Sequence, residues 1–304
     1  GYPDYPMSPE LVSLVNEAMK NDFNQYAPMP GWMPLRESIA EKVNFLYQTT
    51  INPDTEITIT PGGTYAIYSS FTAILQPGDE VIVFEPAYDS YISNIEVTGA
   101  KAVTINLVYP DYQIDWVAVQ NAITPKTKAI MPVHMCGSMA DMDALIAICK
   151  EHKLILLEDA CQSIGGKYKG KSLGTIGNAG TFSFDFVKTM TCGEGGVVMT
   201  NREDIFIKSD GYTDHGHDHK GADRGADLHP FIGYNYRISE LHAAVGLAQI
   251  KRLEEFLAIQ KKNHALLKDI LVSVPEISFR RIPDPAGDSC SFVSWFLPTE
   301  EITR

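Results

Sequence analysis

The chain has 304 residues, enough for one large domain or for a large and a small one. Its hydrophobic content of 44% and charged content of 21% are ordinary for a globular protein. The formal net charge of -13 argues against nucleic-acid binding, which needs clustered Lys and Arg. No apolar run is long enough to span a bilayer and the first residues do not resemble a signal peptide, so we expect a cytoplasmic enzyme without a membrane partner.

The first 50 residues contain two amphipathic helical patterns, at residues 10–20 and 35–47. Residues 24–34 between them, NQYAPMPGWMP, are too rich in Pro and Gly to be regular. We expect this aromatic loop to pack against another surface.

From residue 56 onward, apolar strand patterns alternate with helical patterns. The expected strands are residues 57–60, 81–84, 102–105, 129–133, 154–157, 181–186 and 197–200, and the expected helices are 66–75, 116–123 and 142–152. This order predicts an α/β fold in three layers, with a mostly parallel sheet covered by helices on both faces. Ligands of such sheets bind outside the carboxyl ends of the strands.

The segment 181–186 alternates Phe with Thr, Ser and Asp, which predicts a half-buried strand. Lys188 follows where that strand is expected to end, and the glycine-rich turn 192–196 leads into the next strand. An amine held between two rigid strands suits Schiff-base chemistry. Taken alone, however, Lys188 reads as one more solvated lysine.

Three other strand ends carry residues of interest. Gly63 and Thr64 follow the first strand and open a helix, an arrangement that can hold a phosphate, although any tight turn uses glycines. Tyr88 follows the second strand and could lie flat on a planar ligand. Asp159 ends a buried strand, where a carboxylate is costly unless it is paired or used, and Glu158 is its alternate.

A phosphate cradle, a flat aromatic, a carboxylate and a lysine are the four contacts that pyridoxal 5'-phosphate requires. The motifs also lack the glycine spacing of a dinucleotide fold and the GKS/T of a P-loop. We therefore predict this cofactor rather than NAD or ATP.

Long motifs in the second part of the chain carry a resemblance to a known family: PVHMCGSMADMD, EDACQS, GNAGTFSFDFVKTMTCGEGGVVMTN and GYNYRISELHAAVGLAQI. Through them, residues from about 128 to 304 resemble the DegT/DnrJ/EryC1/StrS sugar aminotransferases and look closest to the branch that aminates 3,8-dideoxy-octulosonate. Residues 1 to about 125 resemble class I amino-acid aminotransferases of the methionine or kynurenine type, through GYPDY, NQYAPMPGWMPLRE, ITPGGTYAIY and FEPAYDSY. Both families share the type I pyridoxal phosphate fold.

The resemblance implies a role for each candidate site residue. Lys188 is implied as the Schiff-base lysine, Asp159 as the partner of the pyridine nitrogen and Gln162 as the contact of the ring hydroxyl. The phosphate contacts are Gly63, Thr64 and Ser183, the stacking ring is Tyr88, and the residues reaching the neighbouring subunit of a homodimer are Asn235 and Tyr26.

The resemblance also implies a reaction: an amino donor, expected to be glutamate, passes its amino group through the cofactor to a keto or aldehyde sugar. Two alternatives stay open, namely an amino-acid aminotransferase acting on 2-oxo acids and a non-catalytic chain that combines or shortens the two folds. Class I enzymes carry an asparagine that PVHMCG lacks, and their carboxylate-binding arginine would lie beyond residue 304. These departures favour the sugar branch.

Three domains are expected: an N-terminal segment with a dimer-contact loop (1–50), a large cofactor-binding domain (51–250) and a linker helix with an incomplete small domain (251–304). One helical pattern is expected to run from residue 238 to about 272. His215, His217 and His219 alternate in DHGHDH, where a metal site, a loop over the sugar and a solvated loop are all compatible with the pattern. The five cysteines form no CxxC pair, so we expect reduced thiols and no metal centre.

Overall fold

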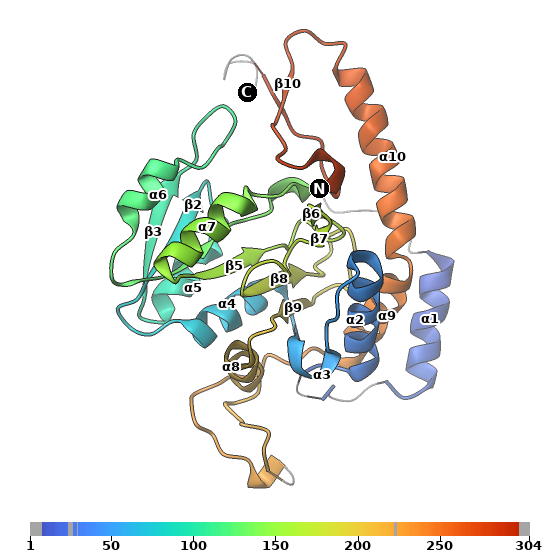
Figure 1. The fold of residues 1–304 in the computed structure, drawn as a ribbon. Coiled ribbons are helices and arrows are strands. Elements are labelled where there is room, and N and C mark those ends of the chain that lie inside the picture. Colours follow the sequence, from blue (N-terminus) through green and yellow to red (C-terminus); the bar gives the residue numbers. More distant parts are fainter. Residues whose placement is uncertain (1–7, 24–26, 29, 222–223, 298–304) are drawn as a thin grey trace.

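The structure is a computed structural model, and it describes residues 8–23, 27–28, 30–221 and 224–297. A seven-stranded sheet in the order β1-β9-β8-β5-β4-β2-β3 forms its centre (Figure 1). The strands are β1 (Ile57–Thr60), β2 (Glu80–Glu85), β3 (Lys101–Asn106), β4 (Thr127–Met131), β5 (Ile155–Asp159), β8 (Ala179–Ser183) and β9 (Gly196–Met199). No helix in the described ranges is both long and apolar enough to cross a membrane.

Parallel pairing dominates this sheet, as the alternation of strands and helices predicts. The pairs β3–β2, β2–β4, β4–β5 and β5–β8 are parallel, and β9 is antiparallel to both of its neighbours, β8 and β1. The expected α/β fold with a mostly parallel sheet is therefore confirmed. Strands β1, β8, β5, β4 and β2 run in the same direction and end at the same edge of the sheet. The candidate site residues lie at or just after the ends of four of them, β1, β2, β5 and β8.

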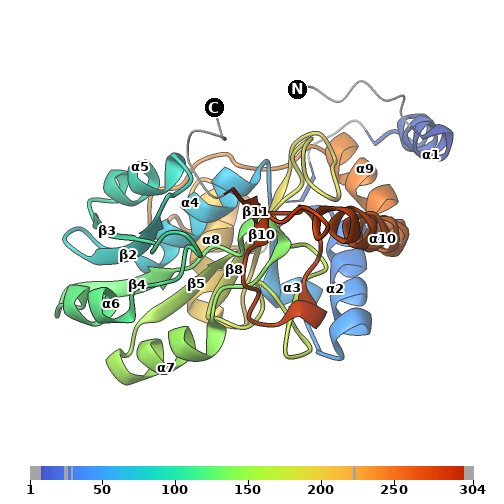
Figure 2. The ribbon, with the colours of Figure 1, turned by 90° about the horizontal axis from the view of Figure 1, so that it is seen from above.

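Helices cover both faces of the sheet (Figure 2). One face carries α4 (Gly63–Ile74), α5 (Ser90–Val97) and α8 (Glu203–Thr213), packed on apolar residues of β2, β4 and β5. The opposite face carries α6 (Trp116–Ala122) and α7 (Met142–His152), with Val119 and Leu145 fully buried against it. Alternate residues of one strand therefore reach different layers.

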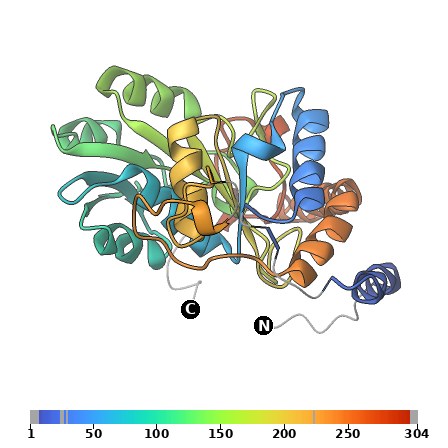
Figure 3. The same cartoon turned by 90° about the horizontal axis from the view of Figure 1, so that it is seen from below.

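A third core lies over the β1–β9–β8 end of the sheet. It joins α2 (Met33–Tyr47), α9 (Glu240–Lys251) and the start of α10 (Leu253–Leu271) through residues such as Leu35, Ala243 and Leu257. Helix α1 (Pro9–Lys20) packs on α9 at the margin of the molecule (Figure 3), and the short α3 (Pro53–Glu56) leads into β1. The short elements are β6 (Lys167–Tyr168), β7 (Lys171–Ser172), β10 (Ser278–Phe279), β11 (Trp295–Phe296), η1 (Met135–Gly137), η2 (Arg224–Ala226) and η3 (Pro285–Gly287).

Two sequence expectations about these elements were wrong. The helical pattern expected to run from residue 238 to 272 is two helices, which meet at Arg252, where φ is -97° and ψ is -1°. The strand expected at 181–186 ends at Ser183 and is buried on both faces, so it is not half-buried. Both patterns were correct in kind and wrong in extent, because periodicity cannot show where backbone pairing stops.

Candidate active site

The turn after β1 places glycine directly against another strand. Gly62 caps α4 without a side-chain hydrogen bond, so the N–H groups of the first turn have no partner inside the helix. A Cβ on Gly63 would lie 2.6 Å from Cβ of Ser183, and Ser183 is buried at the end of β8. Only glycine fits there, and the turn leaves unpaired backbone donors beside a hydroxyl, which suits an anion.

Tyr88 lies next to this helix start. Its hydroxyl is 3.2 Å from Oγ1 of Thr64, and its ring is half exposed. The ring of Tyr91, in the first turn of α5, meets it edge-on with centroids 5.6 Å apart. The expected flat aromatic therefore stands at the rim of the phosphate cradle, held by another tyrosine.

Asp159, the last residue of β5, is 4% exposed and points into the α4–α5 layer. Its Oδ1 accepts a hydrogen bond from the Cys161 N–H at 2.9 Å, and its Oδ2 accepts one from the Tyr91 hydroxyl. Burial, followed by the nearby Asp159 charge, raises the pKa of Tyr91, so this hydroxyl stays a donor. Asp159 is thus a buried carboxylate oriented by two donors.

Glu158 points to the opposite face of the sheet and is fully buried there. It accepts hydrogen bonds from the N–H groups of Gly174, Ile176 and Gly177 at 2.6 to 2.9 Å, and it lies 2.8 Å from Nε2 of His134. These bonds fix the turn that precedes β8. Of the two adjacent carboxylates, Glu158 therefore serves the fold and Asp159 faces the site.

Lys188 lies in the connection between β8 and β9 rather than at the tip of a strand. Its Nζ is 3.8 Å from the Asp185 carboxylate, a distance that leaves the amine without a close partner in this pair. The connection is closed at its base by the Phe184 N–H, which donates to Gly195 O at 2.7 Å. The lysine is held by this tied turn.

Cys161 lies between Asp159 and the start of α4. A Cβ on Gly63 would lie 3.1 Å from its sulfur. Burial and the Asp159 carboxylate raise the pKa of its thiol well above the usual range, while the Lys188 ammonium acts in the other direction. The charges of Asp159 and Lys188 thus act in opposite directions on one buried thiol, whose sulfur lies beside Gly63.

Gln162 follows on the next turn and is fixed by two contacts. Its side-chain oxygen accepts the Cys136 N–H at 3.1 Å, and its backbone oxygen accepts the Ser291 hydroxyl at 3.1 Å. Asn235 forms an isolated bridge with Asp214, and its side-chain oxygen accepts from Nε of Arg237 at 2.8 Å. Tyr26 lies outside the described residues.

Comparison with known proteins identifies the family of this chain. A profile of the DegT/DnrJ/EryC1/StrS aminotransferase family matches residues 54–302. The chain belongs to this family. The match begins well before residue 128, so it includes the phosphate cradle and Tyr88 as well as the Lys188 turn.

Individual relatives support the family assignment. The chain is 36% identical over 201 residues to a GDP-perosamine synthase of Caulobacter vibrioides, covering 66% of this chain and 53% of that protein. It is 34% identical over 280 residues to a putative L-glutamine:3-amino-2,3-dideoxy-scyllo-inosose aminotransferase of Micromonospora echinospora, covering 91% and 64%. The chain thus spans between half and two thirds of the length of these relatives.

A solved structure shows the same fold. The structure described as E. coli GDP-4-keto-6-deoxy-D-mannose-3-dehydratase with bound hydrated PLP superposes with a TM-score of 0.83 at 21% identity, covering 99% of this chain and 79% of that one. The expected type I pyridoxal phosphate fold is therefore confirmed.

In this DegT family member, two of the three alternating histidines lie close to carboxylates. His219 contacts Asp210 at 2.7 Å through Nδ1 and Asp214 at 3.1 Å through Nε2, and these hydrogen bonds raise its pKa to about 9. His217 is buried and lies 3.2 Å from Asp227. His219 is thus bonded to two carboxylates and helps to hold this loop in place, while the roles that the histidine pattern allowed stay predictions.

Two residues that contact Asp159 were not predicted from the sequence. Tyr91 was not among the expected site residues, although its spacing of three from Tyr88 places both rings on one side of a helix start. Cys161 was treated only as a packing thiol. Its position two residues after Asp159, on a turn at a strand end, was the available signal.

Proposed function

We propose that this chain carries the active site of a pyridoxal phosphate-dependent aminotransferase, which transfers an amino group from glutamate to a keto or aldehyde sugar. The observation that carries the proposal is the buried Asp159 carboxylate, which Tyr91 and the Cys161 N–H hold in place on a turn whose Cys161 sulfur lies beside Gly63. Family membership and the sugar-related relatives support the same reaction class.

The residues present fit this cofactor. Gly63 lets the start of α4 lie close to the Ser183 hydroxyl, and the first turn of α4 offers N–H donors. A hydroxyl and free N–H groups together suit a phosphate. Asp159 is a buried carboxylate for the ring nitrogen, and the Lys188 amine has only a distant carboxylate beside it. The residues that would hold the cofactor are Gly63, Thr64, Tyr88, Asp159, Gln162, Ser183 and Lys188.

When bound, the cofactor supplies a carbonyl carbon for the amino group and a ring that withdraws electrons. Lys188 would hold the cofactor through its amine, and the same amine, once released, would carry a proton from the donor. Tyr91 and the Cys161 N–H hold the Asp159 carboxylate, which would face the ring nitrogen. Tyr88 covers the ring at the rim.

Several finer predictions belong to this proposal. A homodimer would bring Asn235 and Tyr26 to the phosphate of the neighbouring subunit. Ile232 and Tyr234, beside Asn235, are 83% and 50% exposed, which supports an interface there. The cytoplasmic location and the domain divisions at residues 50 and 250 stay predictions from the sequence.

Replacement of Lys188 by Ala tests the cofactor chemistry. We expect the variant to lose the visible absorbance of covalently held cofactor and nearly all amino transfer, because no other amine can substitute. Lys208→Ala, which removes an exposed lysine on α8, is the matched control. Retention of a covalently held cofactor by Lys188→Ala would contradict the proposal.

The substrate class is tested separately. Glutamate with a nucleotide-linked or octulosonate-type keto sugar is compared with methionine and a 2-oxo acid, at equal enzyme concentrations. We expect the sugar pair to react at least tenfold faster. The reverse order would favour the amino-acid aminotransferase, and covalent cofactor without either reaction would favour the non-catalytic chain.

A further inference from the structure

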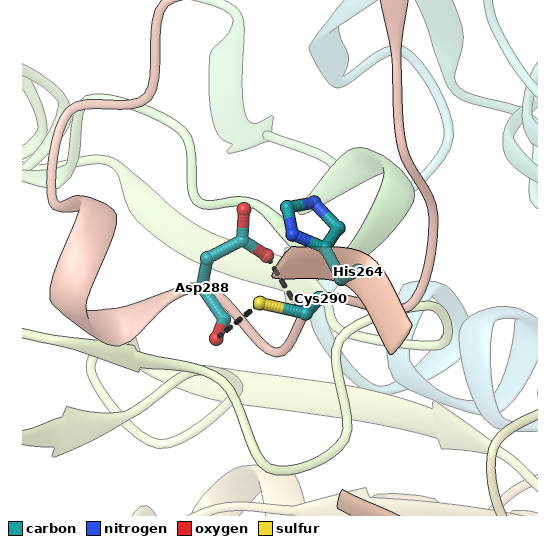
Figure 4. A group of neighbouring side chains, drawn as sticks. All are labelled: His264, Asp288 and Cys290. Atoms are coloured by element: carbon teal, nitrogen blue, oxygen red, sulfur yellow. Dashed lines mark hydrogen bonds between the residues drawn. The ribbon is translucent and has the colours of Figure 1, made fainter. Parts of the chain in front are cut away.

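Three metal-ligating side chains, none of them a candidate active-site residue, meet between helix α10 and the segment after η3 (Figure 4). His264 comes from α10, and Asp288 and Cys290 come from the segment. One imidazole nitrogen, one carboxylate oxygen and the sulfur all lie within 4.8 Å of one another. We propose that these three residues bind one divalent ion of the zinc class.

The spacing suits an ion after a small movement. For three atoms no more than 4.8 Å apart, there is a point within about 2.8 Å of all of them. Zinc bonds to nitrogen, oxygen and sulfur are about 2.0 to 2.3 Å long. Each ligand atom therefore has to move by roughly half an ångström to one ångström, which side-chain rotation on a surface helix and a loop can provide.

Asp288 is already oriented as a ligand. It is 4% exposed, its Oδ2 accepts the Ser138 hydroxyl at 3.0 Å, and its Oδ1 accepts the Cys290 N–H at 2.7 Å. Each carboxylate oxygen can accept a second interaction. Hydrogen bonds of this kind hold metal-binding carboxylates in place.

The other two ligands, Cys290 and His264, can also reach an ion. Cys290 has a φ of 63°, a left-handed conformation that is strained for a residue with a side chain, and its sulfur turns back to 3.6 Å from Asp288 O. His264 has no hydrogen-bond or ion-pair partner among the described residues, so its ring nitrogens remain free to bind.

The donor set selects the class of ion. One nitrogen, one oxygen and one sulfur suit Zn²⁺ and exclude ions that prefer oxygen alone, such as Mg²⁺ and Ca²⁺. The thiol proton leaves to solvent, and the thiolate and carboxylate together balance the ion's two positive charges. Three protein ligands leave one tetrahedral position for water.

Such an ion would fasten α10 to the segment beside the candidate site. Ser289 N donates to Gly137 O at 3.1 Å, and Ser291 donates to Gln162 O at 3.1 Å, so the residues on both sides of Cys290 contact the loops at the strand ends. The metal site does not depend on the proposed aminotransferase reaction, and its test uses no substrate.

The test starts with the purified protein, freed of metal by a chelator and desalted. Zn²⁺ is added, excess ion is removed, and bound zinc is measured by elemental analysis. Co²⁺ is then used in its place, and the difference spectrum against metal-free protein is recorded for thiolate-to-cobalt absorption. We expect one ion per chain and a thiolate band.

Variants decide whether these residues are the ligands. Cys290→Ser is expected to lose the thiolate band, and His264→Gln to weaken binding at least tenfold. Cys136→Ser removes another partly exposed cysteine and is expected to leave both signals unchanged. The proposal is overturned if wild type holds less than half an ion per chain, or if Cys290→Ser, with its circular dichroism unchanged, binds as wild type does.

Discussion

The Tyr91 hydroxyl donates its hydrogen to the Asp159 carboxylate, joining the first turn of α5 to the end of β5. Both side chains are buried, at 2% and 4% exposure, so water cannot replace this bond easily. The relationship makes Tyr91 a positioning residue for the acid that is predicted to face the cofactor ring.

Tyr91→Phe keeps the ring and removes the hydroxyl. We expect the catalytic efficiency kcat/KM to fall about tenfold, since a hydrogen bond to a charged group contributes about 1.5 kcal/mol. Steady-state kinetics over a range of pH measures the loss. Tyr112→Phe, on an exposed loop, is the control, and equal kinetics for the two variants would refute the positioning role.

Two neighbouring glycines give a matched test of the cradle. A Cβ at Gly63 would meet Ser183 at 2.6 Å, whereas a Cβ at Gly62 would lie 3.4 Å from the Tyr65 ring on an extended backbone. We expect Gly63→Ala to weaken cofactor binding at least tenfold more than Gly62→Ala does. Cofactor titration followed by absorbance compares the two variants. Similar affinities would mean that the close contact of Gly63 with Ser183 does not matter for cofactor binding.

Glu158→Gln tests the opposite face of β5. Its carboxylate accepts three backbone N–H groups and pairs with His134 inside the core, so we expect a loss of about 3 kcal/mol and a fall in Tm of at least about 6 °C. Thermal unfolding measures it against Glu96→Gln, an exposed control. A shift below about 1 °C would mean that the buried charge is not needed.

His219 predicts a pH-dependent contribution to stability. Its pKa is raised to about 9 by Asp210 first and then by Asp214, so its stabilisation is complete below about pH 6.5 and is lost as pH rises through 9. The Tm difference between wild type and His219→Gln is therefore expected to be largest at pH 6 and small at pH 10. His152→Gln is the control, and a difference independent of pH would contradict this account.

The order of elements could be predicted from the sequence because buried parallel strands and amphipathic helices have distinct periods. The identity of the strand-end residues then followed from one rule about parallel sheets. Strand lengths could not be predicted in the same way. The strand ends at Ser183, and Phe184 then closes the turn by bonding to Gly195 O and to the Cys192 N–H, a long-range pattern that no periodicity encodes.

Roles that depend on contacts between distant residues were also out of reach. Glu158 and Asp159 are adjacent acids, and only the contact of Asp159 with Tyr91 shows which one faces α5. His264 lies more than twenty residues before Asp288 and Cys290, and no motif links them, so a metal site there could not be predicted from the sequence. Such groups form only after the chain folds.

Because Glu158 and Asp159 point to opposite faces of β5, the register of this strand determines both the stability of the turn before β8 and the position of the candidate catalytic acid. A single inserted or deleted residue within β5 would turn each acid toward the other's surroundings, leaving the turn before β8 without its acceptor and the site without its carboxylate. Length changes in this strand should therefore be far less tolerated than substitutions of its apolar residues. One insertion or deletion would both destabilise the fold and remove the carboxylate from the site.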